Sequence, residues 1–228
     1  RDFLVNQQFR RDYWVKGPRV LAASQVAAAK RAQRVVLVTP RAAVTLKVTG
    51  HVGEAVLTEK IYAPILDVLA DHQPHSLGEL EQMLQGKGIS FGHLCEAITM
   101  FIGKNDLLAA QDEALLSQAK AKTDRLNLHL MEQARISADI SYLVSPVTGG
   151  GVTVGRFEQL FLLAQSQNLT GPEAWAGFVW QVLQSEGQRI IKEGKQLTTP
   201  QENMAELLKQ ATEFANTRWP ILKSLQIA

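Results

Sequence analysis

Hydrophobic residues recur at near-helical spacing along residues 1–16, and basic residues lie between them. This pattern predicts an amphipathic helix that ends at the Gly17-Pro18 break. The helix carries four large aromatic rings, which need a surface to pack against. We therefore expect Phe9 and Trp14 to pack on the β segments of this chain.

Two arginines of the same segment indicate that it also contacts a further domain. We expect Arg10 and Arg11 to face a further domain that precedes residue 1, so that Phe9, Arg10, Arg11 and Trp14 form a domain interface. The motivation is charge, since residues 1–34 carry eight basic and two acidic side chains, a local charge of +6. The alternative is that both arginines are solvated or paired with nearby carboxylates, where each exposed pair contributes only about 0–1 kcal/mol.

Residues 34–50 contain two segments rich in β-branched side chains, and Pro40 separates them. The segments 34–40 and 43–50 predict a hairpin or two adjacent strands that cover one face of a small core. An alanine-rich stretch, residues 21–32, precedes them.

Residues 59–111 have the pattern of three short helices followed by a strand. The first helix contains Pro64, which is tolerable only in its first turn. The second begins with Ser76 as its cap, and Glu79 completes a capping box. The third is capped by Ser90, and the strand comes after it. This order of elements is typical of a winged-helix unit.

The rest of the chain has the pattern of helices, with one glycine-rich loop among them. The longest predicted helices span residues 112–135, 173–194 and 201–225. The predicted fold class is therefore α+β, mostly α-helical, with a winged-helix unit, a small β element and a helical C-terminal extension. The predicted domains are residues 1–58, 59–111 and 112–228.

The composition is that of an ordinary globular protein. The chain has 228 residues, of which 46% are hydrophobic and 20% charged, and its formal net charge is +2. It has no run of about 18 apolar residues and no signal-peptide pattern, which argues against a membrane partner and against export. Its single cysteine, Cys95, excludes an intrachain disulfide and fits a reducing compartment. We therefore expect a cytoplasmic protein.

The predicted winged-helix unit raises the question of DNA binding. Affinity for DNA requires lysine or arginine side chains that neutralise phosphates. The third helix, residues 91–103, contains neither and includes Glu96, and residues 59–111 carry a net charge of −4. We therefore expect no specific binding of nucleic acid. A protein-interaction module of the same shape is the alternative interpretation.

Candidate catalytic and metal-ligating residues are few. Cys95 has His93 two residues away, but on a helix these side chains point in different directions, which favours a structural thiol over a nucleophile. Asp71, His72 and His75 lie close in sequence, yet no second cluster of ligands accompanies them. A solvated helix end is the better interpretation of this segment. We expect neither a catalytic residue nor a metal site.

The glycine-rich loop TGGGVTVG, residues 148–155, invites comparison with a dinucleotide-binding turn. A G-x-G-x-x-G motif that begins at Gly149 requires glycine where this chain has Val154. A tight loop is the better interpretation, so we expect no cofactor-binding residue in this chain.

Several segments resemble a known family. Residues 3–17, FLVNQQFRRDYWVKG, are similar to the closing helix of the predicted regulatory domain of bacterial S-adenosylmethionine-dependent methyltransferases. In that helix an aromatic-arginine pair, here Phe9-Arg10, follows an acidic-aromatic start, here Asp2-Phe3. The segments DRLNLHLMEQA, YLVSPVTGGGVTV and WPILKSLQI look like the C-terminal winged-helix region of protein-lysine methyltransferases of the rickettsial outer-membrane-protein type. The resemblance spans most of the chain in order, and its motifs are short.

The resemblance implies an enzyme whose catalytic domain, with bound S-adenosylmethionine, precedes residue 1. Residues 1–58 would then include the end of the regulatory domain. This chain would be noncatalytic, would dock on the catalytic domain and would help to position a protein substrate. The sequence leaves open the methyl acceptor and whether the protein is a homodimer. A free-standing winged-helix transcription regulator is the alternative from another class.

Overall fold

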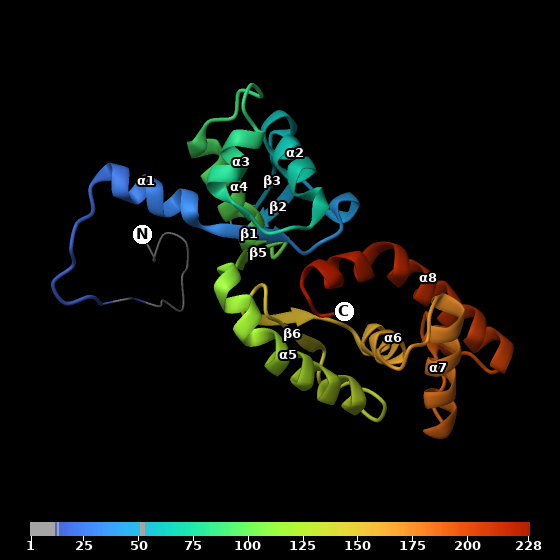
Figure 1. Cartoon of the computed structure of the whole chain (residues 1–228). Helices are drawn as coiled ribbons and strands as arrows, with labels where there is room; N and C mark the ends of the chain where they lie inside the picture. Colours follow the sequence, from blue (N-terminus) through green and yellow to red (C-terminus); the bar gives the residue numbers. More distant parts are fainter. Residues whose placement is uncertain (1–11, 13, 51–52) are drawn as a thin grey trace. The chain divides into compact units, whose positions relative to one another are not determined.

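The computed structural model describes residues 12, 14–50 and 53–228 (Figure 1). The chain divides into two compact units, residues 1–109 and 110–228. The fold is α+β and mostly helical, with small antiparallel sheets, which confirms the predicted class. Within the described part of the chain, no helix is both long enough and apolar enough to cross a membrane.

The N-terminal unit contains a three-stranded sheet in the order β4-β1-β5. Its central strand, β1 (Arg34–Leu37), pairs antiparallel with β4 (His75–Ser76), and β5 (Leu107–Ala110) lies on its other side. The helices of the unit are α1 (Ala23–Ala32), α2 (Glu59–Val68), α3 (Leu77–Met83) and α4 (Phe91–Gly103). A separate hairpin consists of β2 (Lys47–Gly50) and β3 (Gly53–Val56).

The core of this unit lies between β1 and the helices α2, α3 and α4. Val35, Val36 and Leu37 are at most 2% exposed, so β1 is covered on both faces, and this explains its continuous apolar sequence. The helices contribute the large side chains of the core, among them Ile65, Leu66, Leu80, Leu94 and Phe101.

The predicted pairing of residues 34–40 with residues 43–50 is wrong. Pro40 is followed by a short 3-10 turn, Arg41–Ala43, so the chain turns away before a second strand can return along β1. The strand β2 begins only at Lys47 and pairs with β3. The partners of β1 are instead distant in sequence. Pro64 also differs from the expectation, because it lies in the interior of α2, which begins at Glu59.

The predicted helix caps are confirmed. The backbone N–H of Glu79 donates to Ser76 Oγ (3.2 Å), and the backbone N–H of Ser76 donates to the Glu79 carboxylate (2.7 Å). Ser90 Oγ likewise accepts from the backbone N–H of His93 (3.2 Å). These bonds satisfy N–H groups that a helix leaves free at its start.

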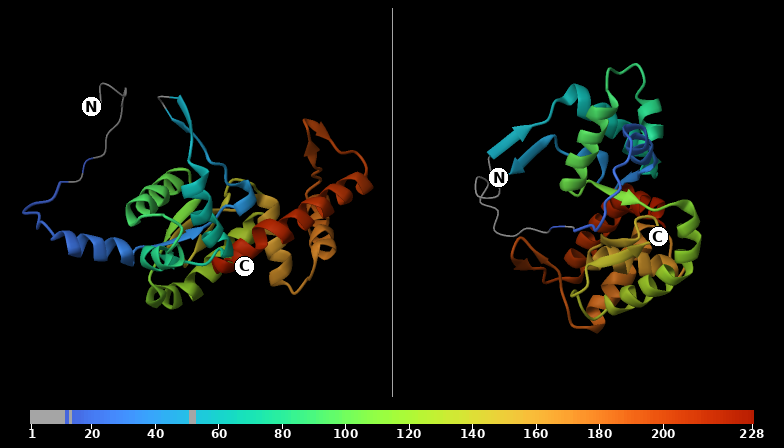
Figure 2. Two further views of the ribbon diagram at one scale, coloured as in Figure 1. Left: turned by 90° about the horizontal axis from the view of Figure 1, so that it is seen from above. Right: turned by 90° about the vertical axis from the view of Figure 1, so that its left-hand side faces the viewer.

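The C-terminal unit contains four α-helices and two small hairpins. The helices are α5 (Glu113–Gln133), α6 (Arg156–Ser166), α7 (Pro172–Ser185) and α8 (Pro200–Ser224). The first hairpin consists of β6 (Tyr142–Ser145) and β7 (Gly150–Thr153). The second consists of β8 (Ile191–Lys192) and β9 (Lys195–Gln196), and it projects beyond the ends of α7 and α8 (Figure 2).

Aromatic side chains fill the space between α6, α7 and α8. The Trp175 ring lies 6.0 Å from Phe214 and 5.7 Å from Trp219, and Phe161 lies 5.5 Å from Phe214, centroid to centroid. Trp175 is 3% exposed, and its indole N–H donates to the carbonyl of Leu169. Trp175 is therefore a core residue of the C-terminal unit.

The predicted helix at 173–194 is too long. Helix α7 ends at Ser185, where Gly187 has φ +63° and the backbone N–H of Gln188 donates to the carbonyl of Leu183. This is the glycine-terminated helix end expected where the chain needs a left-handed residue. Residues 191–196 then form β8 and β9, whose turn residues Glu193 and Gly194 also have positive φ.

Candidate functional site

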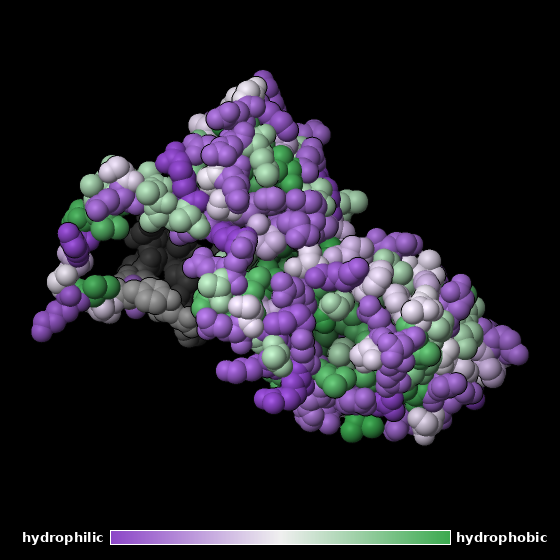
Figure 3. All heavy atoms as spheres, viewed as in Figure 1, coloured by the Kyte–Doolittle hydropathy of each residue, from purple (hydrophilic) through white to green (hydrophobic). Residues whose placement is uncertain are grey.

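An exposed arm leads into the N-terminal unit. We define the arm as residues 14–32, which comprise an irregular segment and the helix α1. No residue of α1 is buried, and the hydrophobic side chains that the arm leaves exposed are Trp14, Val15, Val20, Leu21 and Val26. Hydrophobic residues accordingly interrupt the polar surface along the arm (Figure 3). Contact surfaces typically expose apolar side chains, so the arm is a candidate for such a surface.

The arm is basic as well as apolar. Lys16, Arg19 and Lys30 are exposed, and the two cations of its last turn, Lys30 and Arg31, lie where the helix dipole favours positive charge. Alanine, the best helix former, supplies half of α1, which favours a helix at this exposed position. The exposed surface of the arm therefore combines positive charge with apolar side chains.

Arg31 joins the C-terminal end of the arm to the rest of the N-terminal unit. Arg31 donates two parallel hydrogen bonds to the Glu81 carboxylate of α3, at 2.6 and 2.9 Å. Its guanidinium also lies 4.3 Å from the centre of the Phe91 ring, at the start of α4. The mutual hydrogen bond raises the pKa of Arg31 and lowers that of Glu81, so both groups stay charged. We call Arg31, Glu81 and Phe91 the anchor.

Two backbone features bring α1 close to α3. A Cβ atom on Gly78 would lie 3.4 Å from both the Cβ and the carbonyl oxygen of Arg31, so the two helices are within contact distance at this point. The backbone N–H of Leu77 donates to the carbonyl of Gln33 (2.9 Å), directly after α1. A depression at the α3–α4 turn borders the anchor, since Glu81 and Phe91 line it.

The predicted interface residues fall mostly outside the described part of the chain. Phe9, Arg10 and Arg11 lie outside it. Trp14 is described: it belongs to no helix, and it is 91% exposed. The expected packing of Trp14 on the β segments is therefore wrong. Its ring is free to contact another surface.

The exposed face of α4 contains no lysine or arginine. Gly92, His93, Glu96, Thr99 and Ile102 are exposed there. The phenolic O–H of Tyr62 donates to Glu96 (3.4 Å), and burial together with the neighbouring carboxylate raises the pKa of that tyrosine. This face is neutral to acidic, so it lacks the groups that bind phosphates.

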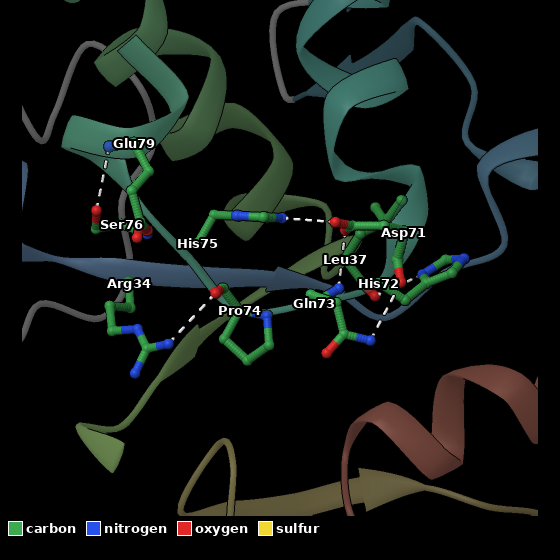
Figure 4. Close-up of polar contacts among 9 residues, drawn as sticks. All are labelled: Arg34, Leu37, Asp71, His72, Gln73, Pro74, His75, Ser76 and Glu79. Atoms are coloured by element: carbon green, nitrogen blue, oxygen red, sulfur yellow. Dashed lines mark hydrogen bonds and ion pairs between the residues drawn. The ribbon is translucent and has the colours of Figure 1, made fainter. Parts of the chain in front are cut away.

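The segment DHQPH is a structural turn (Figure 4). His75 Nε2 lies 2.8 Å from an Asp71 carboxylate oxygen, whereas His72 Nδ1 lies 2.9 Å from the carbonyl oxygen of Leu37. The other Asp71 oxygen accepts from the backbone N–H of Gln73 (2.9 Å). The two imidazoles therefore have different partners. In the residues that the structure describes, no group of three or more histidine, cysteine or acidic side chains can hold a metal ion.

The glycine-rich loop is closed by a side chain of the same unit. Gln111 donates from its side-chain amide to the carbonyl of Pro146 (3.0 Å) and from its backbone N–H to the carbonyl of Val147 (2.7 Å). Gly149 has φ +67°, and a Cβ atom there would lie 2.5 Å from the Gln111 amide. The Gln111 side chain therefore occupies the space beside this loop.

The anchor could not be found from the sequence. Its only local signals are a pair of cations, Lys30-Arg31, at the end of an alanine-rich segment, and a glycine, Gly78, near the start of α3. Neither signal identifies Glu81 or Phe91 as partners, because these residues are about 50 to 60 positions away in sequence.

Comparison with known proteins found a relative that matches along the whole chain. The chain is 38% identical over 228 residues to the uncharacterized protein sll1526 of Synechocystis sp.. The chain spans 44% of the length of that relative. No protein-family model matches the chain. No solved structure matches it either.

Proposed function

We propose that this chain is the noncatalytic, substrate-positioning portion of an S-adenosylmethionine-dependent methyltransferase that acts on a protein. The observation that carries the proposal is the arm, whose apolar and basic side chains are exposed while its end is held by the anchor. We propose that the arm docks on the catalytic domain of the longer protein. The resemblance of residues 3–17 to the closing helix of a methyltransferase regulatory domain supports this assignment.

The winged-helix interpretation of the N-terminal unit belongs to the same proposal. The order α2, β4, α3, α4, β5 supports this interpretation, because a winged-helix unit has helices and strands in a similar order. One departure is that β5 leads after two residues into α5, and the third strand of the sheet is β1, which comes before the helices. The exposed face of α4 favours a protein partner over DNA, because it lacks cations.

S-adenosylmethionine would bind outside this chain. The glycine-rich loop, filled by Gln111, supports that placement. The role of this chain in methyl transfer would then be orientation of the acceptor and exclusion of water.

The proposal is tested in the full-length protein. We expect Leu21→Asp, on the arm, to reduce transfer of labelled methyl groups to proteins of a cell extract, and to leave S-adenosylmethionine binding unchanged. Ile191→Asp is the matched control, since Ile191 is equally apolar, is 70% exposed and lies on the β8–β9 hairpin rather than on the arm. A full-length protein that does not bind S-adenosylmethionine would exclude the proposed function. Equal activity of both variants would exclude docking through the arm.

The transcription-regulator alternative has its own test. Salt-sensitive and sequence-dependent retention of a DNA duplex by this chain, lost on Thr99→Glu in α4, would support that alternative and contradict the proposal.

A further inference from the structure

The two outer edges of the β6–β7 sheet differ in how their backbone groups are satisfied. In the register of this hairpin Tyr142 lies opposite Thr153, and Val144 lies opposite Gly151. The backbone N–H of Val154 donates to the carbonyl of Ser141, which marks that pair as hydrogen-bonded. Because such pairs alternate along an antiparallel ladder, Val144, Gly151 and Thr153 direct their backbone groups away from the partner strand.

The outer edge of β6 is closed by one side chain. Asn127 of α5, which is 2% exposed, donates from its amide nitrogen to the carbonyl of Val144 (2.8 Å). Its amide oxygen accepts from the N–H of Val144 (2.7 Å). The side chain thus replaces the peptide group of a neighbouring strand.

The outer edge of β7 is open. Gly151 and Thr153 are exposed, and the outward N–H and C=O of Gly151 have no hydrogen-bond partner within the described residues. Arg218 donates to the carbonyl of Thr153 (2.7 Å), which fixes one end of the edge. The sequence Gly150–Thr153 contains no lysine or proline, the residues with which proteins usually block a free edge.

A tyrosine ring lies beside this edge. Tyr142 is 55% exposed, and its side chain passes 3.6 Å from the position of a Cβ atom on Gly151. The ring therefore covers the glycine and offers an apolar surface next to the open backbone groups. A strand that paired with β7 would place alternate side chains on the face that carries Tyr142.

We propose that β7 accepts an extended segment of another protein as an additional strand. The open groups are those of a backbone, so the ligand must supply a backbone in extended form, and Tyr142 adds a contact for one apolar side chain of that segment. A second copy of this chain fits less well. A four-residue edge buries much less than the roughly 1,200 Å² that a stable interface between folded proteins needs. This inference does not depend on the proposed methyltransferase function.

The test is selection of phage-displayed random peptides on the immobilised chain. We expect selected peptides to lose affinity by about tenfold or more in Gly151→Pro, which removes the outward N–H and adds a ring at the edge. The bonds between β6 and β7 do not use this N–H, so the hairpin keeps its own ladder. Gly151→Ala is the matched control, because it keeps the N–H and its Cβ makes only ordinary contact with Tyr142. Circular dichroism establishes that both variants are folded.

A second measurement uses the unaltered chain. Binding of a selected peptide should slow hydrogen exchange at the amides of Gly151 and Thr153. The proposal would be overturned if no selected peptide lost affinity in Gly151→Pro. It would also be overturned if the selected peptides left the amides of Gly151 and Thr153 unprotected. A chain that forms a dimer in ultracentrifugation, and loses it in Gly151→Pro, would identify a second copy as the occupant and would also overturn it.

Discussion

Replacement of Asn127 by alanine removes a single amide group, yet it should destabilise the C-terminal unit strongly. The side chain makes two hydrogen bonds with the backbone of Val144 and is 2% exposed. Leaving a buried donor or acceptor unsatisfied costs about 1–3 kcal/mol. Val144 is half-buried, so water reaches its groups in part, and we expect a loss of about 2–4 kcal/mol in the free energy of unfolding.

Urea unfolding followed by tryptophan fluorescence measures this loss. Three of the four tryptophans, Trp175, Trp180 and Trp219, lie in the C-terminal unit, so the signal reports mainly on that unit. Gln118→Ala is the control, because Gln118 is an exposed amide on the same helix and should change stability by at most about 0.5 kcal/mol. A loss in Asn127→Ala no larger than in this control would refute the reasoning.

Asn127→Asp should keep one of the two hydrogen bonds and remove the other. Its carboxylate still accepts from the N–H of Val144 but meets the carbonyl of Val144 without a proton to donate. Burial beside a carbonyl raises the pKa of such a carboxyl in the folded state, so the penalty is present above the ordinary pKa of about 4 and shrinks as pH falls. A penalty independent of pH would show that Val144 is not the partner that matters.

Three further predictions concern the helix ends and the anchor. Glu79 accepts a hydrogen bond from the backbone N–H of Ser76, which lowers the pKa of Glu79 below its ordinary 4.5. The carboxylate therefore stabilises the fold above that pH, and this stabilisation is lost on acidification. In acid unfolding followed by circular dichroism, Glu79→Gln should lack this pH-dependent loss of stability. Arg156 donates to two carbonyls at the end of α5, so Arg156→Ala should lower the urea midpoint by an amount equivalent to about 1–3 kcal/mol, whereas equal stability would contradict this role. Arg31→Ala should speed hydrogen exchange along α1, and Lys30→Ala should not; equal rates would show that the anchor does not hold the arm.

The helix starts of the N-terminal unit could be predicted because their signals are local. Ser76, Glu79 and Ser90 lie within three residues of the groups they bind, so spacing alone identifies them. The partners of β1 could not be predicted in this way. Val35 pairs with His75, forty residues later, and a buried apolar strand gives no sign of which neighbour it chooses.

The candidate site was also hard to predict, because it depends on contacts between residues that are distant in sequence. Exposure of the arm follows from its alanine-rich sequence only once the rest of the unit is known to leave it uncovered. The sequence predicts a packed Trp14 because large rings usually are packed, yet no surface within the described residues covers it. Asn127 escapes prediction for the opposite reason, since a single amide in a long polar helix resembles any exposed residue until the strand beside it is placed.

Only Gln33 separates the last residue of α1 from the first residue of β1, and its carbonyl is bonded to the start of α3. The connection between the arm and the central strand of the sheet is therefore too short for the two to move independently. A protein bound to the arm would therefore be coupled in orientation to the sheet of the N-terminal unit. A few glycines inserted after Gln33 would form a flexible linker. The arm would stay attached to the N-terminal unit, but its orientation would no longer be coupled to that of β1.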